Sequence, residues 1–215
     1  DGTKLLDAGA KLSSGSATNA NGFAWFDVDV PIRSESYPDS GNSGRYRIVE
    51  ITAPAGYLLD STPVDVEFTY VGQQIAWQVV NGTNTNLRTS VDISKQDITN
   101  GKELPGAKLE IRDADGNLVE GWTSGKVPHT VRGLELEKEY ILTEKRAPDG
   151  YAEAESIVFK LVQEGTEQVN EVYVKSDNGW TKLDDTTVIM QDAVARRGDE
   201  RAVQHLRTGD LAELA

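Results

Sequence analysis

The chain has 215 residues, of which 38% are hydrophobic and 27% charged, and its formal net charge is −13. This length fits one large domain or two of about 100 residues each, and the composition is that of a folded protein. The acidic excess argues against nucleic acid as a partner, because phosphate binding needs clustered lysine and arginine. No apolar run of about 18 residues predicts a membrane span, and no secretory signal opens the chain. Cysteine is absent, so a secreted protein with this sequence would need another staple or a sufficient core.

Two sequence patterns occur twice along the chain. Gly-Ala-Lys-Leu stands at 9–12 and again at 106–109, and Glu-x-x-Ala-Pro-x-Gly-Tyr stands at 50–57 and again at 144–151. The same order at nearly the same spacing makes a chance match very improbable, so the repeats indicate two homologous domains. The predicted organisation is a first domain at 1–88, a second at 89–193 and a tail at 194–215.

Both halves alternate apolar and polar residues with the period of β-strands. Turn signals such as Asp-Gly-Asn at 115–117 separate these stretches. Short strands at this spacing predict an all-β sandwich. The alternation stops in the tail, which favours a short amphipathic helix or a flexible segment. The predicted strands are 23–30, 45–51 and 64–70 in the first half, and 108–112, 139–144, 156–162 and 169–174 in the second.

The second half carries motifs that resemble a known family. They are Ile-Ser-Lys-Gln-Asp at 93–97, Gly-Lys-Glu-Leu-Pro-Gly-Ala at 101–107, Tyr-Ile-Leu-Thr-Glu at 140–144, Ala-Pro-Asp-Gly-Tyr at 147–151 and Val-Ile-Met-Gln-Asp-Ala at 188–193. These residues resemble the Cna B-type, or SpaA-like, prealbumin-like domain of Gram-positive pilins and surface adhesins. The second domain is especially similar to the branch found in fibronectin-binding proteins and used for split-protein ligation, and the first domain is similar to the family more loosely. The resemblance implies two tandem immunoglobulin-like (CnaB-type) β-sandwiches.

The same resemblance implies an intramolecular amide cross-link in the second domain. Lys95 would be the nucleophile, Asp192 the acceptor and Glu144 the acid/base that moves the protons. An ammonium has no lone pair, so the amine must lose a proton, and a carboxylate resists attack, so the acceptor must gain one. Burial in an apolar core disfavours both charged forms, and fixed proximity supplies the rest of the rate. The alternative is an ordinary buried ion pair that does not react.

The first domain repeats only part of this set. Glu50 matches Glu144 in position, whereas the matching lysine would fall before Asp1. We therefore expect no complete reactive triad in the first domain of this chain. Spacing does not choose among the acceptor candidates, which are Asn81, Asn84 and Asn86.

Several short signals also have ordinary interpretations. Arg197-Gly198-Asp199 spells an integrin-recognition tripeptide, and residues 206–210 faintly resemble the end of a sortase sorting signal, but patterns this short arise by chance. His129 and His205 are far apart in sequence, so we expect neither a metal site nor a serine-type triad, and no cofactor. The four tryptophans could form sugar-stacking platforms, although such residues are more often sheet aromatics.

The expected function is structural. The domains would be stalk or shaft modules of an extracellular, cell-wall-anchored adhesin or pilin, with neighbouring domains of the same protein as partners. The cross-link consumes its own residues once, so we expect no enzyme that acts on external substrates. Two alternatives remain: a host-matrix-binding region, or a carbohydrate-binding module of a secreted protein.

Overall fold

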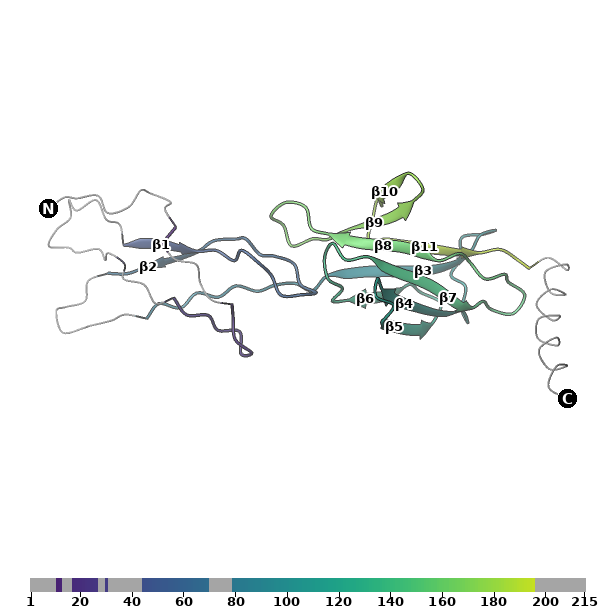
Figure 1. The fold of residues 1–215 in the computed structure, drawn as a ribbon, viewed down its shortest axis with the longest axis horizontal. Helices are drawn as coiled ribbons and strands as arrows, with labels where there is room; N and C mark the ends of the chain where they lie inside the picture. Colours follow the sequence, from purple (N-terminus) through teal and green to yellow (C-terminus); the bar gives the residue numbers. More distant parts are fainter. Residues whose placement is uncertain (1–10, 13–16, 27–29, 31–43, 70–78, 196–215) are drawn as a thin grey trace. The chain divides into compact units, whose positions relative to one another are not determined.

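The computed structural model of the chain shows an all-β protein (Figure 1). Its described residues contain strands and no helix, and therefore no helix long and apolar enough to cross a membrane. The residues that the structure describes are 11–12, 17–26, 30, 44–69 and 79–195.

The chain forms two compact units that interleave in sequence. The first comprises Asp1–Val49 and Thr62–Asn84, and the second comprises Glu50–Ser61 and Thr85–Ala215. Residues 50–61, which belong to the first sequence repeat, therefore pack with the second repeat. The domain boundaries predicted from the repeats, 1–88 and 89–193, describe which residues are homologous rather than which residues pack together. These boundaries stay a prediction.

The first unit contains one strand pair in its described part. Strand β1 (Arg45–Ile48) pairs antiparallel with β2 (Val64–Glu67), and Tyr46 packs edge-on against Phe68 with ring centroids 5.9 Å apart. Both strands were predicted, and each is shorter than its sequence pattern.

The strand predicted at 23–30 is wrong where the structure describes it. Residues 23–26 form no strand, and the indole of Trp25 is 73% exposed. The main chain makes a turn instead, in which the N–H of Asn19 donates to the carbonyl of Phe23 and the N–H of Gly22 donates to that of Asn19. Alternation alone does not make a strand, because its main-chain groups need a neighbouring strand to pair with.

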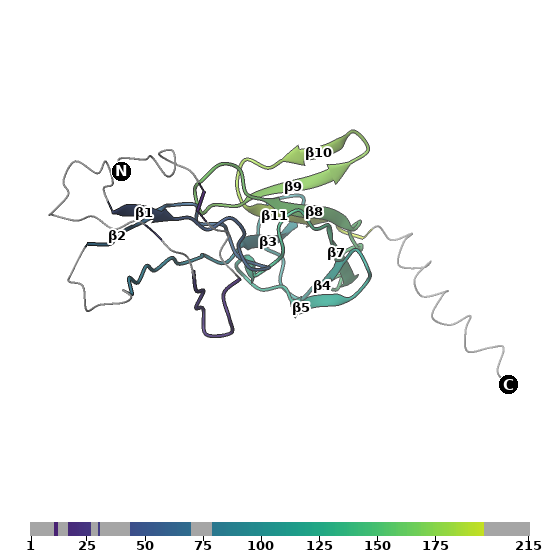
Figure 2. The ribbon, with the colours of Figure 1, turned by 60° about the vertical axis from the view of Figure 1, so that its left-hand side comes forward.

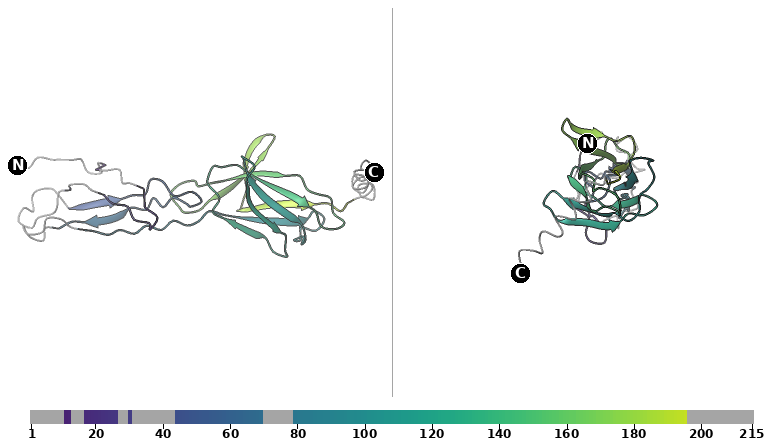
Figure 3. Two further views of the ribbon diagram at one scale, coloured as in Figure 1. Left: turned by 60° about the horizontal axis from the view of Figure 1, so that its bottom comes forward. Right: turned by 90° about the vertical axis from the view of Figure 1, so that its right-hand side faces the viewer.

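The second unit is a sandwich of two sheets (Figure 2). The larger has the strand order β10-β9-β8-β7-β4-β5, and the smaller has the order β11-β3-β6. The first strand, β3, and the last strand, β11, run parallel side by side (Figure 3, left). In this register Met190 is opposite Lys95. The bounds are β3 Ser90–Asp97, β4 Lys108–Asp113, β5 Leu118–Thr123, β6 His129–Arg132, β7 Tyr140–Arg146, β8 Ile157–Val162, β9 Glu171–Ser176, β10 Gly179–Lys182 and β11 Thr187–Asp192.

One hydrophobic core fills the space between these sheets. Its largest fully buried apolar side chain is Phe159, which packs against Tyr140 with ring centroids 5.8 Å apart. Successive side chains of a strand point to opposite faces, so strands such as β4, β8 and β11 give the core every second residue. The buried aliphatic residues of the core are Val91, Ile93, Ala107, Leu109, Ile111, Val131, Leu134, Leu142, Leu161, Val172 and Val188.

The repeated Ala-Pro-x-Gly-Tyr motif folds into the same turn in both repeats. The N–H of each tyrosine, Tyr57 and Tyr151, donates to the carbonyl of the proline three residues earlier at 3.1 Å. The preceding glycines have positive φ angles, 77° at Gly56 and 87° at Gly150. Only Gly56 is crowded, because a Cβ there would lie 2.4 Å from the carbonyl oxygen of Gly133.

Replacing Gly56 with alanine is expected to destabilise the protein more than replacing Gly150. Both variants place a Cβ on a left-handed backbone, at about 1–2 kcal/mol, and only Gly56→Ala adds the overlap, at about 1–3 kcal/mol. Urea unfolding of the two variants measures the difference. Equal losses would show that the approach of Gly56 to Gly133 does not constrain the fold.

Candidate functional site

Three charged side chains lie at inward-facing positions of their strands, where the other inward-facing residues form the hydrophobic core. Lys95 lies on β3, Asp192 on β11 and Glu144 on β7, so the first two come from the smaller sheet and the third from the larger. Each occupies an inward position of its strand, where period-two alternation points the side chain between the sheets. The core residues at the preceding inward positions are Val91 and Ile93 on β3, Val188 and Met190 on β11, and Tyr140 and Leu142 on β7.

The predicted trio is brought together by the fold. The Nζ atom of Lys95 lies directly against Oδ1 of Asp192 and 3.2 Å from Oε1 of Glu144. The side chain of Lys95 is 1% exposed, and those of the two acids are fully buried. An amine and two carboxyl groups therefore share one water-excluded space in the interior.

Glu144 is held by one main-chain contact and by its apolar surroundings. Its Oε2 atom accepts a hydrogen bond of 2.8 Å from the N–H of Ala154. Burial raises the pKa of Glu144 above its usual range, against the opposing effects of that hydrogen bond and of Lys95. An upward shift makes this carboxyl group a better proton acceptor than an ordinary glutamate, which is the property that an acid/base needs.

The ion pairs of the trio leave one carboxylate oxygen without a partner. Oε1 of Glu144 has the 3.2 Å contact with Nζ of Lys95 but no hydrogen bond of good geometry, and Oδ2 of Asp192 is buried with no hydrogen-bond partner. An unpaired buried acceptor costs about 1–3 kcal/mol, and more when it is charged. Amide formation between Lys95 and Asp192 would remove one carboxylate oxygen and two charges, and protonation of Glu144 would give the remaining oxygens a donor.

A second polar group lies beside the trio and was missed by the sequence analysis. Asp97 is opposite Asp192 in the parallel register, and its carboxylate accepts hydrogen bonds from the Tyr151 hydroxyl at 3.0 Å and from the N–H and hydroxyl of Thr99. The hydrogen bonds from Thr99 lower the pKa of Asp97. This acid is therefore held as a carboxylate by its own partners. Tyr151 ends the repeated motif, which is the signal that could have drawn attention to it.

The structure places Glu50 beside one of the three candidate asparagines. Nδ2 of Asn86 donates to Oε2 of Glu50 at 2.5 Å and to the carbonyl of Leu58 at 2.8 Å. Asn81 and Asn84 are exposed, whereas Asn86 is half-buried. The lysine predicted to precede the chain remains a prediction.

The main-chain hydrogen bonds around Asn86 repeat those around Asp192. The N–H of Leu58 donates to the carbonyl of Leu87, the residue after Asn86, just as the N–H of Ala152 donates to the residue after Asp192. Glu50 accepts from the N–H ten residues later, at Asp60, as Glu144 does from Ala154. Asn86 therefore holds the position in the first repeat that Asp192 holds in the second.

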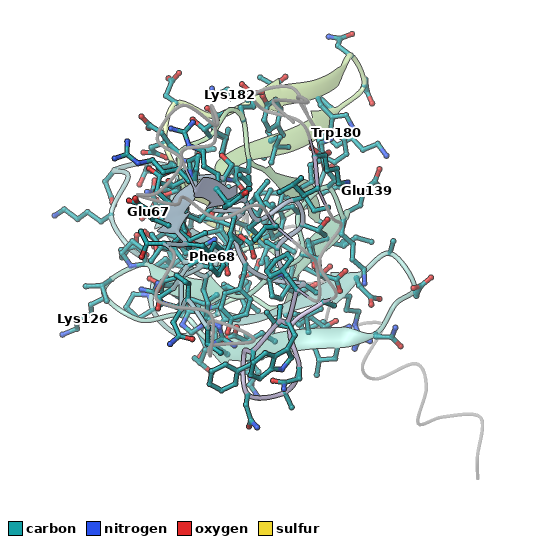
Figure 4. All side chains as sticks on the ribbon, turned by 90° about the vertical axis from the view of Figure 1, so that its left-hand side faces the viewer. Glu67, Phe68, Lys126, Glu139, Trp180 and Lys182 are labelled. Atoms are coloured by element: carbon teal, nitrogen blue, oxygen red, sulfur yellow. The ribbon has the colours of Figure 1, made fainter. Side chains whose placement is uncertain are left out.

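The remaining histidine and tryptophan signals have local partners. His129 stacks on Trp122 with ring centroids 4.5 Å apart and contacts Glu120. Trp180, on the hairpin of β9 and β10 (Figure 4), lies beneath the ammonium groups of two lysines, Lys160 and Lys175, and no tryptophan stacks on another within the described residues. The part of the chain that is described contains no cluster of His, Cys, Asp or Glu fit to hold a metal. The tripeptide at 197–199, the segment 206–210, His205 and Trp77 lie outside the described residues.

Fold and site together define a class: β-sandwich domains in which a buried lysine–carboxylate cluster bridges the first and last strands. The profile of the SpaA prealbumin-like fold domain matches the chain twice, at residues 9–83 and 89–176. The chain belongs to this family, and it carries two such domains in tandem.

Three solved structures show the kind of protein whose fold is similar. They are the Bacillus anthracis TIE protein (24% identity, 71% of this chain and 25% of that one, TM-score 0.44), the pilus-presented adhesin Spy0125 (31%, 44% and 27%, 0.34) and the open form of the pilus adhesin SpaC from Lactobacillus rhamnosus GG (21%, 71% and 25%, 0.40). The chain thus spans about a quarter of the length of each. A search of curated proteins gives no significant match.

Proposed function

We propose that the chain is a load-bearing part of a Gram-positive surface adhesin or pilus, and that Lys95 and Asp192 join in an amide. The buried contact of these two residues with Glu144 carries the proposal. The family membership supports it, since Spy0125 and SpaC are a pilus-presented adhesin and a pilus adhesin.

The reaction uses only groups of the chain. A proton passes from the Lys95 ammonium to the Asp192 carboxylate, which gives a neutral amine and a neutral acid. The amine attacks Cγ of Asp192, Glu144 takes a proton from the attacking nitrogen, and the C–OH bond breaks as Glu144 returns that proton to the leaving hydroxyl. The net change turns one ammonium and one carboxylate into one amide and one water, in a single turnover without a cofactor.

The position of the amide explains why such a domain suits a stalk. β3 and β11 are the first and last strands of the second domain and run parallel side by side. A bond between them carries tension past the intervening strands, whose hydrogen bonds are then not loaded. Cysteine is absent, so this amide would take the place of a disulfide staple.

Location and partners follow from the same proposal. The chain would lie outside the cell, joined to neighbouring domains of a longer surface protein. The adhesive alternative draws on residues 197–199, which lie outside the described residues. The carbohydrate-binding alternative needs paired exposed tryptophans, and the described ones are not paired.

Mechanical pulling on the whole chain tests the proposal. The amide closes a stretch of 97 residues, so this stretch should never extend in the unmodified chain. Lys95→Met should add an unfolding step on the order of 30 nm, the extended length of that stretch. A Lys108→Met control, which changes an exposed lysine of β4, should not add it. The same step in the unmodified chain would contradict the load-bearing function.

A further inference from the structure

The loop that joins β8 and β9 binds other parts of the main chain through its side-chain amides. Oε1 of Gln163 accepts from the N–H of Leu59 at 2.7 Å, and its Nε2 donates to the carbonyl of the same residue at 2.8 Å. Oε1 of Gln168 accepts from the N–H of Leu87 at 2.6 Å, and its Nε2 donates to the carbonyl of Thr85 at 3.0 Å. All these residues belong to the second compact unit.

A third amide of the loop repeats the pattern at the start of β3. Asn170, which is 5% exposed, accepts from the N–H of Ser90 and donates to its carbonyl, each at 2.9 Å. A side-chain amide carries a donor and an acceptor side by side, as a peptide group does. The loop therefore stands in for a neighbouring strand, and it contacts the main chain rather than the side chains of the segments it holds.

The segment held by Gln163 is one of the two that build the Glu50–Asn86 pair. Leu59 lies between Leu58, whose carbonyl accepts from Nδ2 of Asn86, and Asp60, whose N–H donates to Oε2 of Glu50 at 3.1 Å. Holding Leu59 by both main-chain groups fixes the direction of its neighbours' groups as well.

Gln168 holds the second of the two segments that build the Glu50–Asn86 pair. Thr85 and Leu87 are the residues on either side of Asn86, and Gln168 binds one main-chain group of each. The two glutamines thus hold both segments through main-chain groups that flank the pair. Their four hydrogen bonds cross more than 80 positions of sequence.

We propose that Gln163 and Gln168 are positioning residues, through which the second domain sets the geometry of the Glu50–Asn86 pair in the first repeat. The acceptor site of the first repeat is then completed by the domain that follows it. That this pair takes part in amide formation rests on the function proposed above. The geometry of the pair does not depend on that proposal. The partner that the loop fits is the main chain at the base of a preceding SpaA-type domain.

Amide exchange in the full chain, followed by NMR, tests this. The informative signals are the N–H of Asp60 and the side-chain amide of Asn86, since both donate to Glu50 and therefore report on the pair itself. In Gln163→Ala and Gln168→Ala, the exchange rate of Asp60 relative to that of the buried Leu142 should rise about three- to tenfold, and the Asn86 side-chain resonances should shift. Gln191→Ala, which changes an exposed glutamine of β11, serves as the control and should change neither.

The ratio to Leu142 separates a local effect from general destabilisation. An unchanged ratio, with unmoved Asn86 resonances, would overturn the proposal. Gln168→Glu keeps the shape and the acceptor for Leu87 but loses the donor to Thr85, so it gives the same test if an alanine variant does not fold. The intact mass of each variant reports on Lys95 and Asp192 independently, and a failure of the cross-link is therefore distinguishable from a failure of this inference.

Discussion

Glu144→Gln is expected to leave the second domain folded and largely without its amide. Glutamine keeps the size of the side chain and can still accept from the N–H of Ala154, but it cannot take a proton from the attacking Lys95 nitrogen and return it to the leaving oxygen. General acid–base catalysis by a positioned side chain contributes about 10²- to 10⁴-fold in rate. The cross-linked fraction, measured by mass at successive times after purification from denaturant, should grow slower by that factor.

Glu103 provides the matched control for this variant. Its carboxylate also lies near Lys95, yet it accepts from the main-chain N–H of that residue at 3.3 Å and from the hydroxyl of Ser94 rather than contacting the amine. Glu103→Gln should therefore cross-link at close to the normal rate. Equal rates in Glu144→Gln and the unmodified chain would remove Glu144 from the reaction.

Lys95→Met is expected to lower the free energy of unfolding by about 4–5 kcal/mol. The amide closes a loop of 97 residues, and closing a loop of this size restricts the unfolded chain by about that amount. Methionine is unbranched and apolar, so it fills much of the same space without a charge. Chemical denaturation monitored by tryptophan fluorescence measures the loss.

The control for that loss is a lysine that lies outside the core. Lys108 is exposed on β4, and its replacement by methionine should change the unfolding free energy by about 0.5 kcal/mol or less. If Lys95→Met unfolds at the same denaturant concentration as the unmodified chain, no covalent closure stabilises the domain.

Much of the second domain could be predicted from the sequence, because its strands have one buried face. Alternation located β4, β7, β8 and β9, and the family resemblance selected Lys95, Glu144 and Asp192, which the fold brings together. β5 could not be predicted in this way. It is an edge strand with no fully buried residue, so its pattern carries little of the period that a buried face imposes.

The remaining features depend on contacts that leave no period in the sequence. Spacing could not choose among three asparagines, whereas the main-chain hydrogen bonds around Asp192 recur only around Asn86 among them in the described residues. Gln163 and Gln168 are ordinary polar loop residues in the sequence, because what they bind is main chain more than 80 positions away. At 23–26 the sequence misled in the other direction. Its alternation predicted a strand, and the described chain has none there.

The intact mass of the purified chain tests the central claim most directly. An amide between Lys95 and Asp192 predicts a mass lower than that of the sequence by one water, about 18 Da, and a digest should contain the peptides of β3 and β11 joined through these residues. Lys95→Ala and Asp192→Ala should each restore the full mass of their sequence. A full, unmodified mass for the original chain, with the two peptides separate, would contradict the account.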